Sequence, residues 1–271
     1  MKRTRLALVP MFALAALAFA VSPVAAQTSA SAQLINELNA KLLYLAVPIT
    51  IVVEGILLYT VIRFKNADEP KPTRENRRLE ITWTIATAIV LLFVGVASYG
   101  VLANPNVTQA PGSAIPNDGN HVVVYVTGNQ WFWQASYPQY GNFSAPTAQT
   151  PGGPSGPQIV VPKGEPVYFK ITSADVIHSF HVPKLGLKQD AMPGAVHTIR
   201  TVPYETGTYQ GYCAEFCGVG HSQMYFSVKV VSQDQYQKFV QQNQKSSSGS
   251  SSGGNQSVAA PTGALEAAAP A

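Results

Sequence analysis

Charged side chains are scarce in this 271-residue chain, because Asp, Glu, Lys and Arg make up 12% of it and apolar residues 46%. Soluble domains carry roughly 25% charged residues. This shortage argues against an ordinary soluble protein and predicts that part of the chain lies in lipid. The length still allows one or two domains with a substantial core.

The chain also lacks an excess of positive charge outside its N-terminus. The formal net charge is +4, and Lys2, Arg3 and Arg5 supply +3 of it. Residues 104–244 are neutral, with seven Lys and Arg against seven Asp and Glu. A phosphate-binding surface, and with it nucleic-acid binding, is therefore excluded.

Several motifs of well-known catalytic sites are missing. The sequence has no Rossmann or P-loop glycine pattern, no G-x-S-x-G and no C-x-x-C-H. These absences exclude the usual nucleotide-binding loops, a hydrolase nucleophile elbow and a covalently attached haem.

The N-terminus has the pattern of a secretory signal peptide. Basic residues at 2–5 precede an apolar run at 6–21, and small residues at 24–26 precede Gln27. The apolar core is short, which favours cleavage over an uncleaved membrane helix. We therefore expect a signal peptide at residues 1–26.

Two longer apolar segments, at about 42–62 and 81–102, each have about the 20 residues that cross a hydrocarbon core. The first carries one charge, Glu54, and the second carries none. Six Lys and Arg lie in and beside the loop between them, so this loop is expected in the cytoplasm. A membrane hairpin over 27–103 then leaves the following residues on the exported side.

Short β-branched and aromatic segments separated by Pro and Gly begin at His121. Their number and spacing predict an all-β antiparallel sandwich or small Greek-key barrel over 104–244. Residues 145–157 are expected to form a long loop, and the Ser-, Gly- and Ala-rich residues 245–271 a disordered tail. The predicted strands are 121–128, 130–137, 157–161, 166–173, 195–202, 207–213 and 224–231.

Both cysteines lie in one short segment, CAEFCGVGHSQM (213–224), with His178 upstream of it. By composition alone a disulfide is favoured in an oxidising compartment, but a disulfide requires neither His221 nor Met224. A zinc site uses two Cys and two His and leaves Met224 unused. Thiolate, thioether and imidazole together favour copper, and two cysteines on one loop allow two thiolates to bridge two copper ions.

Four segments of the sequence resemble subunit II of haem-copper cytochrome c oxidases, whose dinuclear copper centre is called CuA. The resemblance runs from about Lys41 to Val231. It implies a two-helix membrane hairpin followed by a cupredoxin-like domain. The matching segments are RRLEITWT (77–84), GNQWFWQASY (128–137), IHSFHVPKLGLKQDAMPG (177–194) and CAEFCGVGHSQM (213–224).

The resemblance implies six copper ligands. The two cysteines bridge the coppers, each of two histidines binds one copper, and a methionine sulfur and a backbone carbonyl are weak outer ligands. In chain order these ligands are His178, Cys213, Glu215 through its carbonyl, Cys217, His221 and Met224.

Three further roles follow from the same resemblance. Trp131 matches the aromatic residue that takes electrons from cytochrome c; the alternative is a core aromatic. The Glu215 side chain matches a ligand of Mg²⁺ at the interface with subunit I; the alternative is a solvated loop acid. Glu80 matches the carboxylate at the mouth of a proton channel into subunit I; the alternative is an acid at a helix end.

The chain departs from the family pattern at two positions. Ala195 stands where the family has Arg after Pro-Gly, and Thr87 where it has Pro in the second helix. Asp190 matches an acid near the cytochrome docking surface, but the neutral exported domain argues against docking through a strong acidic patch. Glu54 has no matched role, and we expect it to pair with subunit I, since an ionisable group within a span usually faces protein or water; the alternative is proton transfer.

The resemblance implies an electron-transfer subunit of a proton-pumping terminal oxidase. It would accept electrons from cytochrome c at CuA and pass them to haem in subunit I, where oxygen is reduced. It also implies a bacterial-type cell membrane, an exported C-terminal domain and other oxidase subunits as partners.

Three alternatives differ in what they require. Subunit II of a quinol oxidase has the same architecture but lacks the Cys/His/Met set. Nitrous oxide reductase shares the copper signature but needs a large His-rich propeller. A membrane-tethered copper carrier needs exposed, exchangeable ligands.

Overall fold

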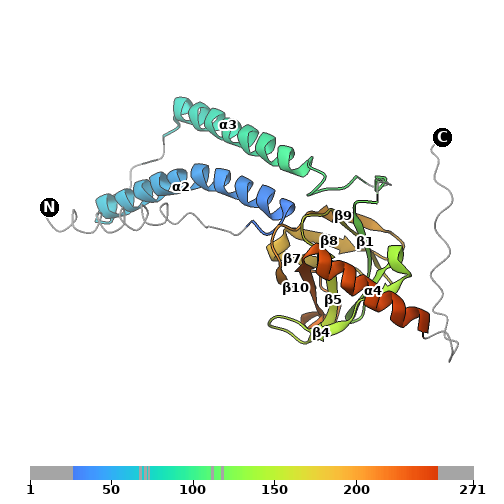
Figure 1. Ribbon diagram of the computed structural model, residues 1–271. Coiled ribbons are helices and arrows are strands. Elements are labelled where there is room, and N and C mark those ends of the chain that lie inside the picture. Colours follow the sequence, from blue (N-terminus) through green and yellow to red (C-terminus); the bar gives the residue numbers. More distant parts are fainter. Residues whose placement is uncertain are drawn as a thin grey trace, which may run out of the picture.

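The computed structural model describes residues 27–66, 69, 72, 74–110, 113–116 and 119–249, the last four without their side chains. The predicted signal peptide and most of the predicted tail lie outside these residues. The described chain forms a helical hairpin followed by a β-domain (Figure 1). The start of α2 and the end of α3 both adjoin the β-domain, so the loop between the helices lies at the far end of the hairpin.

The hairpin consists of α2 (Ala30–Phe64) and α3 (Arg77–Leu102), and both are long and apolar enough to cross a membrane. Each begins at a side-chain cap, because Ser29 accepts a hydrogen bond from the backbone N–H of Ala32 and Asn76 from that of Leu79. The helix α2 extends well before the predicted span at 42–62. Hydropathy detects only the part of a helix that is apolar enough for lipid. The first turn of α2 contacts the β-domain instead, so hydropathy did not reveal it.

The β-domain is a sandwich of two sheets, as predicted, although strands that the sequence did not reveal contribute to both. The first sheet, in spatial order, contains β3 (Phe143–Ser144), β2 (Phe132–Tyr137), β1 (Val122–Asn129), β6 (Val167–Ser173) and β9 (His197–Thr201). The second contains β4 (Thr147–Gln149), β5 (Ser155–Pro162), β11 (Tyr225–Val231), β10 (Gly207–Cys213), β7 (His178–Val182) and β8 (Leu187–Ala191). Three 3₁₀ turns, η1 (Pro138–Tyr140), η2 (Pro183–Leu185) and η3 (His221–Gln223), lie between strands.

The sheets are mixed rather than antiparallel, because β1 pairs in parallel with β6 and β5 with β11. The predicted loop at 145–157 contains β4 and the start of β5, which pair as a hairpin. The strands β7 and β8 were not predicted, since Pro183 and Gly186 interrupt their sequence and leave each strand only five residues long.

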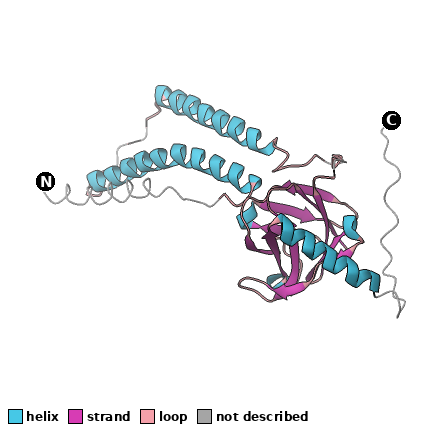
Figure 2. Ribbon diagram, viewed as in Figure 1, coloured by secondary structure: helices cyan, strands magenta, loops and turns pink. Residues whose placement is uncertain are grey.

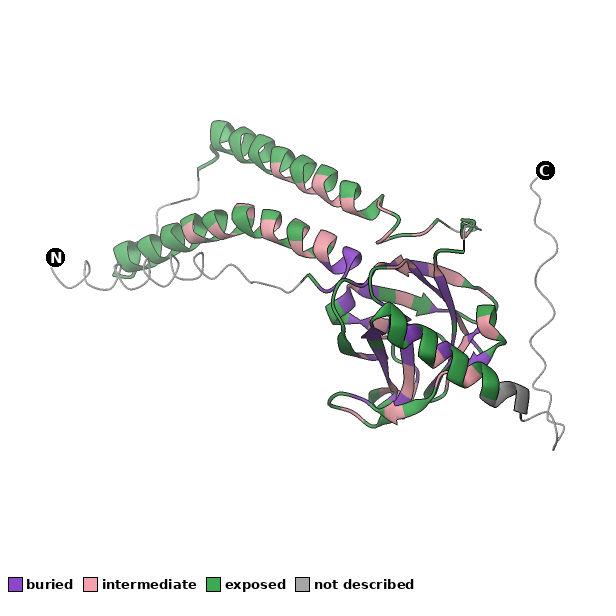
Figure 3. Cartoon of the chain, in the orientation of Figure 1, coloured by how far each residue is buried: buried purple, intermediate pink, exposed green. Residues whose placement is uncertain are grey.

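Aromatic side chains fill the space between the sheets. Phe180 and Phe226 stack with ring centroids 4.4 Å apart, and Trp133 meets them edge-on at 5.9 and 5.5 Å. Such arrangements are favourable beyond the apolar area that they bury. Figure 3 shows the resulting buried interior beside a largely exposed membrane hairpin.

A further helix, α4 (Gln233–Gly249), contacts β5 and β3. Figure 2 shows this helix lying across the strands of the β-domain. Its Tyr236 and Val240 are buried, and Phe239 contacts the rings of Tyr137 and Phe143. The predicted boundary of the tail at residue 245 falls inside this helix. Its periodic apolar residues are few, so the polar composition of the segment conceals it.

Candidate metal centre

The ends of three neighbouring strands bring the candidate ligands together. His178 begins β7, Cys213 ends β10, and Met224 directly precedes β11. The strand β10 lies between the other two, and the backbone N–H of Cys213 donates to the carbonyl of Met224 at 3.0 Å. The connection between β10 and β11 therefore folds back over the ends of these strands and places its side chains next to His178.

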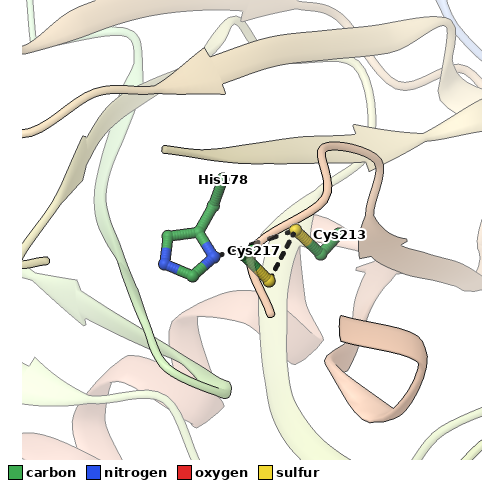
Figure 4. A group of neighbouring side chains, drawn as sticks. All are labelled: His178, Cys213 and Cys217. Carbon is green, nitrogen blue, oxygen red and sulfur yellow. Dashed lines mark hydrogen bonds between the residues drawn. The ribbon is translucent and has the colours of Figure 1, made fainter. Parts of the chain in front are cut away.

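Sulfur and nitrogen atoms converge in this loop. The sulfur of Cys213 lies 3.8 Å from both Nδ1 of His178 and the sulfur of Cys217. The sulfur of Cys217 lies 3.7 Å from Nδ1 of His221 and 3.9 Å from that of Met224. Figure 4 shows the imidazole of His178 and the two cysteine sulfurs facing one another. These three residues could hold a metal ion, since their ligand atoms all lie within 4.8 Å of one another.

The backbone of Glu215 also belongs to this cluster. Its carbonyl oxygen accepts from the thiol of Cys213 at 3.2 Å. All six predicted ligands thus lie in one connected group, and both cysteines are free rather than joined as a disulfide.

The cysteine thiols are buried, and burial opposes their ionisation. His178 is fully buried, and Cys213, Cys217 and Met224 are no more than 4% exposed. Burial, with the adjacent Cys213, raises the pKa of the Cys217 thiol to about 12. Two thiolates this close require a cation between them. The soft sulfur donors and two imidazoles fit copper. The thioether of Met224 is a ligand type that copper binds and that zinc sites do not use.

Asp175 holds His178 from the side away from the sulfurs. Its carboxylate lies 2.8 Å from Nε2 of His178 and accepts from the backbone N–H groups of Gln130 and Val176, each at 2.6 Å. Partial burial acts to raise the pKa of Asp175, but these hydrogen bonds outweigh it and lower that pKa. A carboxylate on the far nitrogen leaves Nδ1 free for a metal. Sequence reasoning missed Asp175, although an acid three residues before a ligand histidine could have indicated it.

Trp131 lies on the outside of the same loop. It is 38% exposed, and its Nε1 donates to the carbonyl of Cys217 at 3.1 Å. Its ring covers the loop so closely that a Cβ on Gly220 would lie 2.5 Å from it. The other aromatic of this segment, Trp133, is buried and packs edge-on against His178, with ring centroids 5.8 Å apart. Trp131 therefore connects the protein surface to a candidate ligand.

The remaining candidates lie outside the cluster. Glu80 is exposed in the first turn of α3, at the far end of the hairpin (Figure 1). The side chains of Glu215 and Asp190 are exposed at the surface of the β-domain, and Glu54 is exposed on α2. None of these four carboxylates meets the copper-ligand candidates.

Comparison with known proteins identifies the family. Residues 122–231 match the family described as cytochrome c oxidase subunit II, periplasmic domain, and residues 15–101 match its transmembrane domain. A relative from Cereibacter sphaeroides, named cytochrome c oxidase subunit 2, is 34% identical over 250 residues, which cover 82% of this chain and 77% of the relative. The chain belongs to the cytochrome c oxidase subunit II family. A Rickettsia bellii relative given the same subunit name is 32% identical over 216 residues, covering 75% of this chain and 77% of the relative.

Among solved structures, the periplasmic domain of subunit II of the cytochrome oxidase of Bradyrhizobium japonicum is 30% identical. The structural alignment covers 49% of this chain and 99% of that domain, with a TM-score of 0.44.

Family membership confirms three expectations. The chain is a membrane protein with two transmembrane helices and an exported C-terminal domain, and that domain is a cupredoxin-like sandwich. It is a subunit of a cytochrome c oxidase, so it works within a larger complex.

Proposed function

We propose that this subunit II receives electrons from cytochrome c at a dinuclear copper centre and passes them to haem in subunit I. The observation that carries the proposal is the convergence of two thiols, an imidazole, a thioether and a carbonyl of residues 213–224 on the imidazole of His178. When bound, a CuA pair supplies one-electron redox chemistry with the electron shared between two metals. Oxygen reduction and proton pumping would take place in partner subunits.

The residues around the cluster keep its geometry constant. Cys213 ends a strand paired on both sides, and His178 is braced by Asp175 and packed against Trp133. Ligands that barely move when an electron arrives keep the cost of reorganisation small. The buried position of Met224 suits a weak outer ligand held in place by packing.

Trp131 is the proposed point at which electrons enter the loop. Its ring is partly exposed to a docking protein, and its indole N–H bonds the carbonyl of Cys217, itself a proposed bridging ligand. Gln130 donates to the same carbonyl at 2.8 Å and fixes its direction. A donor haem that touches Trp131 would therefore be one hydrogen bond from the copper ligands.

Two carboxylates have proposed roles at partner interfaces. The exposed side chain of Glu215 is available to a Mg²⁺ shared with subunit I, while its carbonyl faces the cluster. Glu80, at the other end of α3, is placed for proton uptake into subunit I. If turnover and pumping are unchanged in Glu80→Ala, the proton role is wrong.

Electron paramagnetic resonance with copper quantitation on the full chain in detergent tests the copper centre. We expect two coppers per chain and one unpaired electron shared equally by two copper nuclei. Met224→Leu should change this spectrum, whereas Met192→Leu, which alters an exposed methionine, should not. A single-copper signal, or zinc in place of copper, would overturn the proposal.

A copper carrier is the second candidate function, and burial argues against it. A carrier exchanges its metal through exposed ligands, whereas the sulfurs here belong to residues no more than 4% exposed. Slow copper loss to an external chelator is expected for the relay, and fast loss for the carrier.

A further inference from the structure

The first turn of α2 is buried against the β-domain, unlike the rest of the hairpin (Figure 3). Ser29 and Ser31 are fully buried, and Thr28, Ala30 and Ala32 are at most 7% exposed. Buried hydroxyl groups need hydrogen-bond partners. The partners of the two serines show what this turn is attached to.

Ser29 joins α2 to the segment that continues the strand of His178. Its Oγ accepts from the backbone N–H of Ala32 at 3.1 Å and donates to the carbonyl of Leu185 at 2.7 Å. Leu185 ends η2, which directly follows β7. The next residue, Gly186, has a left-handed φ of +62°, and a Cβ there would lie 2.7 Å from the backbone nitrogen of Ala32. No side chain fits between the helix and this turn.

Ser31 joins both membrane helices to β9. Its Oγ lies 2.9 Å from Oγ1 of Thr201 and donates to the carbonyl of Asn106 at 2.6 Å. Asn106 lies just after the end of α3, and its side chain accepts a hydrogen bond from Arg200. One buried serine therefore bonds both to the segment that leads from α3 into the β-domain and to a strand of that domain.

The backbone adds to this attachment. The N–H of Ala30 donates to the carbonyl of Val202 at 3.0 Å, and the N–H of Tyr204 donates to the carbonyl of Thr28 at 2.7 Å. This pairing continues from β9, which is an edge strand of its sheet. The residues at the start of α2 thus pair with the continuation of this edge strand.

We propose that Ser29, Ser31 and Thr201 are positioning residues that fix the orientation of the copper domain on the membrane hairpin. This inference rests on the proposed function. The chain connects the hairpin to the β-domain once, through the segment that follows α3, and a single connection can swivel unless it is cross-linked. By bonding the start of α2 to this segment and to the β-domain, the serines set the distance from the copper ligands to the electron acceptor in the neighbouring subunit.

The test uses the assembled oxidase and a photoexcited ruthenium complex that injects one electron. Absorbance changes then separate reduction of the copper centre from onward transfer to haem. We expect Ser31→Ala and Thr201→Val to leave the copper spectrum and its reduction unchanged and to slow onward transfer several-fold, because the rate of electron transfer falls steeply with the distance between donor and acceptor. Thr201→Ser keeps the hydroxyl and should restore the rate. Thr147→Val, on an exposed strand position, is the matched control.

Onward transfer at the wild-type rate in both variants would overturn the positioning role, and so would equal slowing of both steps. Distances between spin labels at Tyr59 on α2 and Ser144 on β3 give a second readout in the same complex. We expect the distribution to broaden or shift in Ser31→Ala, and an unchanged distribution contradicts the inference. Absence of a shared-electron copper signal in the wild-type enzyme would instead overturn the proposed function.

Discussion

Replacing Gly128 with alanine would test how tightly the β-domain holds His178. A Cβ on Gly128 would lie 2.7 Å from Cδ2 and 2.9 Å from Cγ of the His178 ring. Carbon atoms in favourable contact lie about 3.5–4.0 Å apart. The ring is fully buried between Asp175 and Trp133, so it has little room to retreat.

The cost of this crowding should fall mainly on metal binding. Extra carbon in a well-packed interior costs about 1–3 kcal/mol. Relief requires the His178 ring to move, which lengthens its hydrogen bond to Asp175 and shifts Nδ1 relative to the sulfur of Cys213. Since about 1.4 kcal/mol corresponds to tenfold in affinity, copper should bind roughly 10- to 100-fold more weakly.

Copper titration against a competing chelator measures this affinity, and thermal unfolding of the copper-free chain measures stability separately. Gly95→Ala is the control, because no atom lies within 4 Å of a Cβ added on that α3 glycine. We expect weaker copper binding and an altered copper spectrum in Gly128→Ala alone. Copper affinity equal to that of Gly95→Ala, with a wild-type spectrum, would refute the reasoning.

Four other perturbations have expected outcomes. Asp175→Ala removes the acceptor on Nε2 of His178 and should lower copper affinity about 10- to 100-fold in the same titration; unchanged affinity would remove its bracing role. Trp131→Phe loses the hydrogen bond to the carbonyl of Cys217 and should slow oxidation of reduced cytochrome c at full copper content, whereas a normal rate would rule out the proposed path. Phe180→Ala should lower the free energy of unfolding by about 3–5 kcal/mol in urea titrations, and Phe216→Ala, at a side chain that is 78% exposed, should change it by less than about 0.5 kcal/mol; equal losses would contradict the assigned core. Because burial raises the pKa of the Cys217 thiol, unfolding experiments should show stability lost as pH rises from about 9 toward 12; Cys217→Ser should lose less over this range, the remainder coming from buried tyrosines with raised pKa values such as Tyr137, and an equal loss would contradict the contribution of Cys217.

The local part of the site could be predicted because most of its donors lie within residues 213–224. Donors that lie so close in the sequence must also lie close together in space. The role of Asp175 could not be predicted in the same way, because it depends on the turn that aims its carboxylate at His178 and Gln130 together. The strand that carries His178 escaped detection as well, since its pairing with β10 and β8, rather than its composition, makes those five residues a strand.

The long-range part of the fold was less visible in the sequence for a related reason. The sequence predicted strands at β1 and β6, yet nothing in either segment indicates that they pair in parallel across intervening chain. Likewise, hydropathy located the membrane spans but not the buried first turn of α2. Its small polar residues are buried only because η2 and β9 supply partners for Ser29 and Ser31.

The loop between β10 and β11 has two faces, and their contrast favours an electron relay over a metal exchanger. Phe216 and Val219 are 78% and 90% exposed, whereas Cys217 and Met224 in the same segment are no more than 4% exposed. Electrons can cross one layer of side chains, whereas an ion must displace it. In the proposed relay, this exposed apolar surface beside Trp131 would dock the electron donor, while the burial of Cys217 and Met224 would slow the access of water and chelators to a bound metal. Copper affinity should therefore respond strongly to substitution of Gly128 or Asp175, which fix His178, and weakly to substitution of the exposed Phe216 or Val219.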